Sequence, residues 1–175
     1  MEQFFTNGLI DTTTLPRFED VQLTSIHPDY WKVILFNLVG AYLIFAASAG
    51  AVMYFTDEKI PYLIFGILAY ILIFCINLII ARISFRNRGF AFRTHDVIYR
   101  SGAISLTTTI IPYNRVQHAA IYEGWLARKF RLAAVEIYTA GGTGSDIKIP
   151  GLEKEHAENI KQLLMGKILK QDNNE

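Results

Sequence analysis

Four histidines are the residues of this 175-residue chain that could most readily carry acid–base or metal chemistry: His27, His95, His118 and His156. Metal-binding sequence motifs place their ligands at short, characteristic spacings, and no two of these histidines stand at such a spacing. The single cysteine, Cys75, lies inside an apolar run, so the sequence offers neither a disulfide framework nor a metal–thiolate cluster. We therefore expect no metal and no other cofactor.

The acidic residues give no sign of a catalytic pair either. Most of them stand in the N-terminal segment, in a short link between two apolar runs and in a C-terminal helical stretch, where charge usually marks a solvated surface. The glycine-rich stretch GGTGSD, residues 141–146, is followed neither by Gly-Lys-Ser/Thr nor by a predicted helix, so we interpret it as a loop between two strands and not as a phosphate-binding loop. The sequence predicts a protein that is not an enzyme.

A group of arginines could bind anions instead. In the stretch IIARISFRNRGFAF, residues 79–92, Arg82, Arg86 and Arg88 directly follow an uncharged apolar run. Each such residue contributes on the order of 1 kcal/mol to attraction by an anionic leaflet. Together with Trp31 and Lys32, which precede the first apolar run, they are our candidates for the membrane interface and for lipid headgroups. The simpler alternative is that the arginines only set the membrane topology.

Two apolar runs, residues 33–55 and 60–81, must position these arginines. Neither run contains Asp, Glu, Lys or Arg, and both exceed the roughly 20 residues that cross a bilayer as a helix. Only residues 56–59 separate them, which predicts an antiparallel helical hairpin. Because the positive charges flank the outer ends of the hairpin, the positive-inside rule places both termini in the cytoplasm.

Two asparagines lie inside the apolar runs. In an antiparallel hairpin Asn37 and Asn77 are at similar depth, and small residues recur at helical spacing near them, so we predict a hydrogen bond between the two amides. The alternative is a transport pathway. That alternative is weaker, because proton and ion routes usually need an ionisable group and neither run has one.

The C-terminal half of the chain predicts a small β-rich domain. Residues 85–150 contain short β-branched and aromatic stretches separated by turn signals, with one helical turn at residues 124–131. After Pro150 and Gly151, apolar residues at spacings of three and four predict an amphipathic helix, with acidic residues in its first half and lysines in its second. This order predicts an α+β domain, a pleckstrin-homology-like (PH-like) antiparallel β-barrel or sandwich closed by a C-terminal helix with the apolar stripe Ala157, Ile160, Leu164 and Ile168.

Three sequence stretches resemble the YdbS-like bacterial PH-domain family: IPYNRVQ at 111–117, GWLARKF at 124–130 and TAGG at 139–142. One position departs from the family pattern, since Arg131 stands where a glycine is usual, and the turn there is expected to differ. The resemblance implies a non-enzymatic interaction module at the cytoplasmic face of a bacterial membrane, often beside a larger relative with several such modules. Arg115, Gln117 and Arg128 in these stretches are candidates for contact with a partner or a small anionic ligand, or for structural hydrogen bonds.

The expected organisation is a cytoplasmic leader (1–32), a two-span transmembrane hairpin (33–81), a PH-like domain (82–170) and a disordered tail (171–175). We expect a multi-pass protein of the bacterial inner membrane that binds anionic lipid headgroups, a membrane-protein partner with related PH-like domains, or a second copy of itself. The alternative is an accessory or regulatory subunit of a transporter or channel. Nucleic acid is not an expected partner, because the net charge is only +1.

Overall fold

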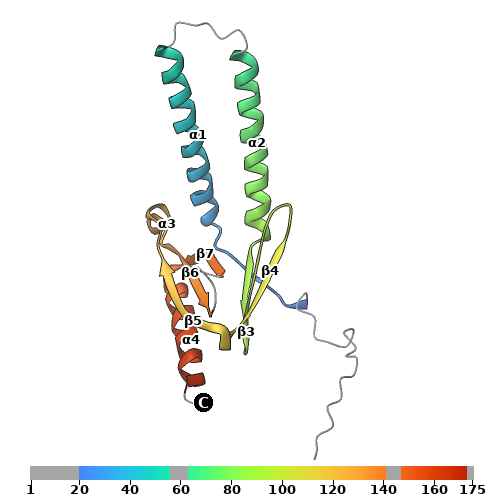
Figure 1. The fold of residues 1–175 in the computed structure, drawn as a ribbon, viewed down its shortest axis with the longest axis vertical. Coiled ribbons are helices and arrows are strands. Elements are labelled where there is room, and N and C mark those ends of the chain that lie inside the picture. The colour runs from blue at the N-terminus through green and yellow to red at the C-terminus, as the bar shows by residue number, and fades with distance from the viewer. Residues whose placement is uncertain (1–19, 56–62, 141–146, 173–175) are drawn as a thin grey trace, which may run out of the picture.

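The computed structural model describes residues 20–55, 63–140 and 147–172 (Figure 1). Its elements follow one another along the chain as β1 (Thr24–Ser25), α1 (Tyr30–Phe55), α2 (Leu63–Asn87), β2 (Gly89–Phe92), β3 (Asp96–Ser101), β4 (Thr107–Pro112), the 3-10 turn η3 (Tyr113–Arg115), β5 (Val116–Tyr122), α3 (Trp125–Lys129), β6 (Leu132–Thr139), β7 (Ile147–Glu153) and α4 (Lys154–Asp172).

The helices α1 and α2 extend together from one end of the β-rich part, which we call the head domain (Figure 1). They contain 26 and 25 residues, which at about 1.5 Å per residue makes each longer than the roughly 30 Å hydrocarbon core of a bilayer. Val33 is the one buried residue of α1, and α2 has none. Core helices of a soluble domain would be largely buried, so both helices have the properties of membrane spans. The predicted link at residues 56–59 lies outside the described residues.

The two long helices contact each other mainly around Tyr42. The Asn77 amide donates hydrogen bonds to the Tyr42 hydroxyl and to the Ile73 carbonyl, both at 3.0 Å, and the rings of Tyr42 and Phe74 lie 4.9 Å apart. The predicted hydrogen bond between Asn37 and Asn77 is therefore wrong. The register of the helices brings Tyr42, five residues further along α1, opposite Asn77, while Asn37 lines a cleft beside α3.

The head domain consists of two antiparallel sheets. One has the strand order β1-β2-β3-β4 and the other the order β5-β6-β7. The helix α4 packs on the second sheet through Ala157, Ile160 and Leu164, with Ile168 partly buried beside them, so the predicted apolar stripe is confirmed. The predicted PH-like sandwich with a C-terminal helix is confirmed as well. Within the described residues the two sheets do not join into a closed barrel.

The N-terminal segment takes part in the head domain, which the sequence did not indicate. Thr24 pairs with Phe90 and Ser25 with Gly89, and Ile26 is only 4% exposed in the core. Residues 24–26 of the predicted leader (1–32) therefore belong to the head domain. The sequence did not indicate this, because a two-residue strand is too short to show an alternating pattern. At the other end α4 continues to Asp172, and residues 173–175 lie outside the described residues.

The turn between α3 and β6 has an unusual backbone. Arg131 has φ of +57°, and no other described non-glycine residue has a positive φ. Its N–H donates to the Arg128 carbonyl at 3.1 Å, and its own carbonyl accepts from the Lys154 N–H at 3.1 Å. Glycine adopts this left-handed conformation at the lowest cost, so the arginine here carries backbone strain that a glycine would relieve.

Candidate functional site: an arginine cleft where the long helices meet the head

Aromatic rings and one arginine connect the two long helices at the head domain. The Trp31 ring of α1 lies 5.8 Å from the Phe85 ring of α2. The Arg82 guanidinium stands 4.8 Å from the Trp31 ring and 5.7 Å from the Phe85 ring. Cation–π contacts of this kind stabilise a pair of elements by roughly 0.5–2 kcal/mol. Arg82 and Trp31 therefore join α1 to α2.

A second set of contacts joins α1 to α3. The Lys32 ammonium lies 2.6 Å from the Asp29 carboxylate and 5.9 Å from the Phe130 ring. The hydrogen bond from Lys32 lowers the pKa of Asp29 below its ordinary value. One turn further along α1, the rings of Phe36 and Phe130 stack at 6.3 Å. Lys32 is thus already paired within the chain.

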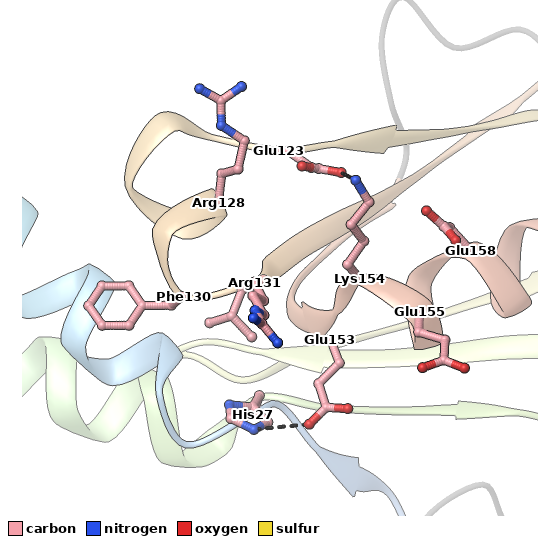
Figure 2. Close-up of a pocket in the computed structure, with 10 residues that line it drawn as sticks. His27, Glu123, Arg128, Phe130, Arg131, Glu153, Lys154, Glu155 and Glu158 are labelled. Atoms are coloured by element: carbon pink, nitrogen blue, oxygen red, sulfur yellow. Dashed lines mark ion pairs between the residues drawn. The ribbon is translucent and has the colours of Figure 1, made fainter.

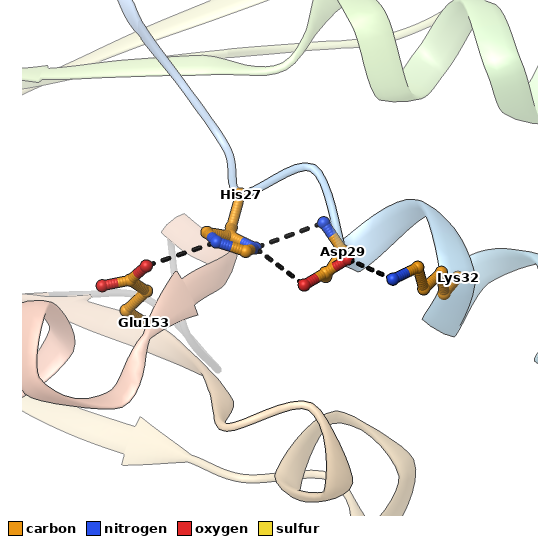
Figure 3. A network of polar contacts seen from close by, with 4 residues as sticks. All are labelled: His27, Asp29, Lys32 and Glu153. Atoms are coloured by element: carbon orange, nitrogen blue, oxygen red, sulfur yellow. Dashed lines mark hydrogen bonds and ion pairs between the residues drawn. The ribbon is translucent and has the colours of Figure 1, made fainter.

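A polar network fixes the start of α1 on β7 (Figure 3). The His27 Nε2 atom lies 3.2 Å from the Glu153 carboxylate, and the Asp29 N–H donates to His27 Nδ1 at 3.2 Å. The backbone adds a hydrogen bond of 2.8 Å from the His27 N–H to the Gly151 carbonyl. Gly151 has φ of +69°, and a Cβ atom there would lie 2.7 Å from the Tyr30 side chain. The first residue of α1 therefore rests directly on the β7 backbone.

Three arginines share one cleft at the head-side end of α2. Arg86 comes from the last turn of α2, Arg88 from the link to β2, and Arg100 from β3, where it pairs with Gly89. The cleft has a volume of about 250 Å³, and no carboxylate of the described residues lines it. Its full lining, which we call the arginine cleft, is Leu23, Ser25, Arg86, Asn87, Arg88, Gly89, Arg100 and Leu106.

These arginines have little internal neutralisation. None of the ion pairs among the described residues involves Arg86, Arg88 or Arg100. The Arg88 guanidinium is half-buried, 5.9 Å from the Tyr30 ring, and its Nε atom has no hydrogen-bond partner within the described residues. Arg100 Nε donates one long hydrogen bond of 3.4 Å to the Thr108 hydroxyl. Guanidinium groups in this state bind phosphate oxygens through paired N–H donors.

The three residues expected to contact a partner do not form one site. Arg115 ends η3 at the start of β5, whereas Arg128 lies in α3 beyond the other end of that strand. Seven strand residues span roughly 23 Å, so the two arginines are at opposite ends of the head domain. Gln117 is exposed on β5, and the Arg115 carbonyl accepts a hydrogen bond from the Ala140 N–H at 3.2 Å.

A larger depression lies between α3, β7 and the start of α4 (Figure 2). Its volume is about 720 Å³, but charges of both signs line it and several are paired, as Lys154 with Glu123 at 3.0 Å. Figure 2 shows the Arg128 guanidinium pointing away from the other labelled groups. The depression therefore favours no ligand charge. Its charged lining is His27, Glu123, Arg128, Arg131, Glu153, Lys154, Glu155 and Glu158.

The four histidines have separate environments. His27 contacts Glu153, His118 stacks on Tyr138 with ring centres 4.2 Å apart, and His156 lies 6.0 Å from the Phe90 ring. His95 is exposed at the turn between β2 and β3. In the parts of the chain that the structure describes, no three His, Cys, Asp or Glu side chains gather as metal ligands would.

Comparison with known proteins places this chain in a family. A family model described as bacterial PH domain matches residues 33–168, which include most of α1, all of α2 and nearly all of the head domain. The chain belongs to the bacterial PH domain family. Over 83 residues it is 34% identical to the transmembrane protein YdbS of Bacillus subtilis (strain 168), a match that covers 47% of this chain and 50% of that relative. The chain thus spans about half the length of the curated relative it matches, and no solved structure matches it.

The family assignment fits the two apolar helices, and the protein is a transmembrane protein with a bacterial PH domain. Of the residues that the sequence singled out at the interface, the structure brings Arg86 and Arg88 into one cleft and uses Trp31, Lys32 and Arg82 in contacts between elements.

Arg100, the third arginine of the cleft, was not recognised from the sequence. Its sequence signal is an arginine at a strand position, and only the pairing of β2 with β3 places it beside Arg88.

Proposed function

We propose that this bacterial PH domain protein is a non-enzymatic module that binds the phosphate groups of anionic lipids in the arginine cleft. The observation that carries the proposal is the gathering of Arg86, Arg88 and Arg100 in one cleft whose lining, among residues 20–55, 63–140 and 147–172, contains no carboxylate. Phosphate is the anion that a membrane surface offers in quantity. Uncompensated guanidinium groups bind it more strongly than ammonium groups do, because their N–H donors match the geometry of the phosphate oxygens.

The depth of the cleft supports a headgroup ligand. Arg82 is the first charged residue of α2 after its long apolar stretch, so the edge of the hydrocarbon core lies near this residue. Arg86 lies four residues further, which is about 6 Å along the helix axis. The headgroup layer occupies roughly 5–7 Å on each side of the core. This depth supports lipid phosphate as the ligand of the arginine cleft.

The proposed orientation has both termini in the cytoplasm and the head domain at the cytoplasmic face of the bacterial inner membrane. It rests on the charge distribution, because Lys32, Arg82 and Arg86 flank the head-side ends of the two helices. Cysteine-accessibility labelling of intact cells tests it. A cysteine introduced in the head domain should be protected from a membrane-impermeant thiol reagent until the cells are opened. Labelling of this cysteine in intact cells would contradict the orientation.

The lipid proposal is tested with the full chain in nanodiscs of phosphatidylcholine and phosphatidylglycerol. The cleft variant Arg86→Ala/Arg88→Ala/Arg100→Ala is compared with the control Arg115→Ala/Arg128→Ala/Lys161→Ala, which removes the same charge from exposed positions elsewhere. At about 1 kcal/mol per residue, the cleft variant should lose preference for spin-labelled phosphatidylglycerol by up to about 100-fold. The control should keep it. Equal preference in both variants would refute the assignment.

A protein partner is the second proposal, whether a membrane protein with related PH-like domains or a second copy of this chain. Arg128 supports it, because this residue is exposed on α3, forms no ion pair within the described residues and points away from the other labelled residues (Figure 2). Arg128→Glu should abolish co-purification of the partner while the head domain stays folded. If the function belonged to a transporter or channel subunit instead, replacing α1 and α2 with an unrelated two-span anchor would abolish the phenotype.

A further inference from the structure

Two tips of the head domain lie beside the long helices and not beneath them. Figure 1 shows the turn between β3 and β4 next to the lower part of α2, and α3 next to the lower part of α1. The contacts agree with the view. The Asn87 amide of α2 donates to the Gly102 carbonyl at 3.1 Å, and the Phe130 ring after α3 stacks on Phe36 of α1. The two tips therefore flank the helix pair on opposite sides.

Both tips expose large apolar side chains. Ile104 is 91% exposed and Leu106 is 57% exposed in the β3–β4 turn, and Trp125 is 69% exposed at the start of α3. A lone exposed apolar residue is ordinary on a soluble surface. Here the exposed residues stand at the two tips of the domain that are nearest to the membrane spans. Contact with the bilayer would explain why these large apolar side chains are exposed at the two tips.

The depth of each tip can be worked out from the spans. Lys32 is the last charged residue before the apolar part of α1, so the edge of the hydrocarbon core lies within about one turn of it; Phe36 is one turn further along α1, and Phe130 packs against it. On the other side Asn87 lies about 7.5 Å beyond Arg82. The β3–β4 turn, which contains Ile104, lies beside the lower part of α2 and not beyond its end, so it recovers that distance (Figure 1). Both tips thus reach the boundary between headgroups and acyl chains.

We propose that Ile104 and Leu106 of the β3–β4 turn and Trp125 of α3 insert into the leaflet on the head side of the membrane. The occupant of this surface is lipid, because the surface is continuous with the two spans at the same depth. Tryptophan favours this boundary. Nearby cations suit it too, since Lys129 lies 5.8 Å from the Trp125 ring and Leu106 borders the arginine cleft.

The β3–β4 tip has a backbone built to hold this position. Gly102 has φ of +129°, and a Cβ atom there would lie 1.9 Å from the Ser105 carbonyl oxygen. The turn is therefore closed tightly on itself, and it presents Ile104 at its end. With the spans, the two insertions attach the head domain to the membrane at three places. The proposal does not depend on phosphate binding in the arginine cleft.

Single-cysteine labelling of the full chain tests the insertion. Cys75 is the only cysteine, so Cys75→Ser provides a clean background for Ile104→Cys, Trp125→Cys and the control Asn114→Cys, which is exposed at the opposite end of β4. Each variant is labelled with the fluorophore NBD in nanodiscs of phosphatidylcholine alone or with phosphatidylglycerol. Lipids brominated on the acyl chain should remove most emission at positions 104 and 125 and little at 114, whereas aqueous iodide should do the reverse.

Iodide quenching at positions 104 and 125 equal to that at 114, in both lipid mixtures, would overturn the proposal. Insertion in phosphatidylcholine discs alongside a failed phosphatidylglycerol preference would refute lipid-phosphate binding and leave insertion intact. A label-free measurement guards against an altered fold. Trp31→Phe leaves Trp125 as the single tryptophan, and brominated lipid should quench its intrinsic fluorescence. Unquenched Trp125 emission in this variant would also count against insertion.

Discussion

Replacing Gly151 by alanine should loosen the attachment of α1 to the head domain. Gly151 has φ of +69°, a conformation that costs an alanine roughly 1–2 kcal/mol. The added Cβ would lie 2.7 Å from Cβ and Cγ of Tyr30, about 1 Å closer than the ordinary carbon–carbon contact of about 3.5–4.0 Å. Such overpacking costs typically 1–3 kcal/mol.

A smaller effect acts in the opposite direction. Alanine restricts the unfolded chain more than glycine does, which returns roughly 0.4–1 kcal/mol. The net loss expected for Gly151→Ala is therefore about 2–4 kcal/mol, a large part of the 5–15 kcal/mol that stabilises an ordinary domain. Tyr30 cannot move away freely, because it begins α1 and the neighbouring His27 is held on β7 by its backbone hydrogen bond.

Hydrogen exchange of the full chain in nanodiscs is the assay. Amides of β6 and β7 should exchange about 30- to 1,000-fold faster in Gly151→Ala, since each 1.4 kcal/mol is tenfold. Gly166→Ala is the matched control. Gly166 is exposed within α4 with no atom within 4 Å of its added Cβ, so the same substitution there should stabilise α4 by roughly 0.5–1 kcal/mol. If the amides exchange at the same rate in both variants, Gly151 does not hold the start of α1 on β7.

Three further outcomes are expected. Arg131→Gly should raise the free energy of unfolding by about 0.5–1 kcal/mol, because relief of the left-handed strain exceeds the entropy cost of glycine; a lower thermal midpoint would contradict this. Tyr42→Phe removes the hydroxyl that accepts from Asn77 and should weaken the helix pair by roughly 0.6 kcal/mol in a steric-trapping measurement, whereas an unchanged value would mean that the bond contributes nothing. The hydrogen bond from Lys148 lowers the pKa of Glu136. The contribution of this pair to the stability of the fold is therefore complete above the ordinary glutamate pKa and is lost as the pH falls through the lowered value. Glu136→Gln should flatten this acid dependence of the thermal unfolding midpoint, and a pH profile identical to that of the unchanged protein would refute it.

The sequence was sufficient for elements with strong periodicity. Uncharged runs identify α1 and α2, and the spacing of Ala157, Ile160 and Leu164 identifies the buried face of α4. These features are visible in the sequence because each depends on the residue types within one element. Contacts between elements were harder. The partner of Asn77 depends on the rotation and register of two helices that are apolar on every side, and composition specifies neither.

The candidate site shows the same division. Arg86 and Arg88 were recognised because they follow an apolar run directly, whereas Arg100 joins them only through its pairing with Gly89. The strand β1 escaped notice for a related reason, since its two residues gain their structure from β2 and not from a pattern of their own. Features that depend on pairing between strands were thus missed, because no local pattern in the sequence marks them.

The pairing of β1 with β2 has a consequence for biosynthesis. Thr24 and Phe90 are neighbours in one sheet, yet both long helices separate them along the chain. A ribosome therefore releases the first strand well before its partner exists, and the sheet closes only after the second helix has emerged. Until then β1 has no strand to pair with, so the edge of the first sheet is completed only when both long helices have been synthesised.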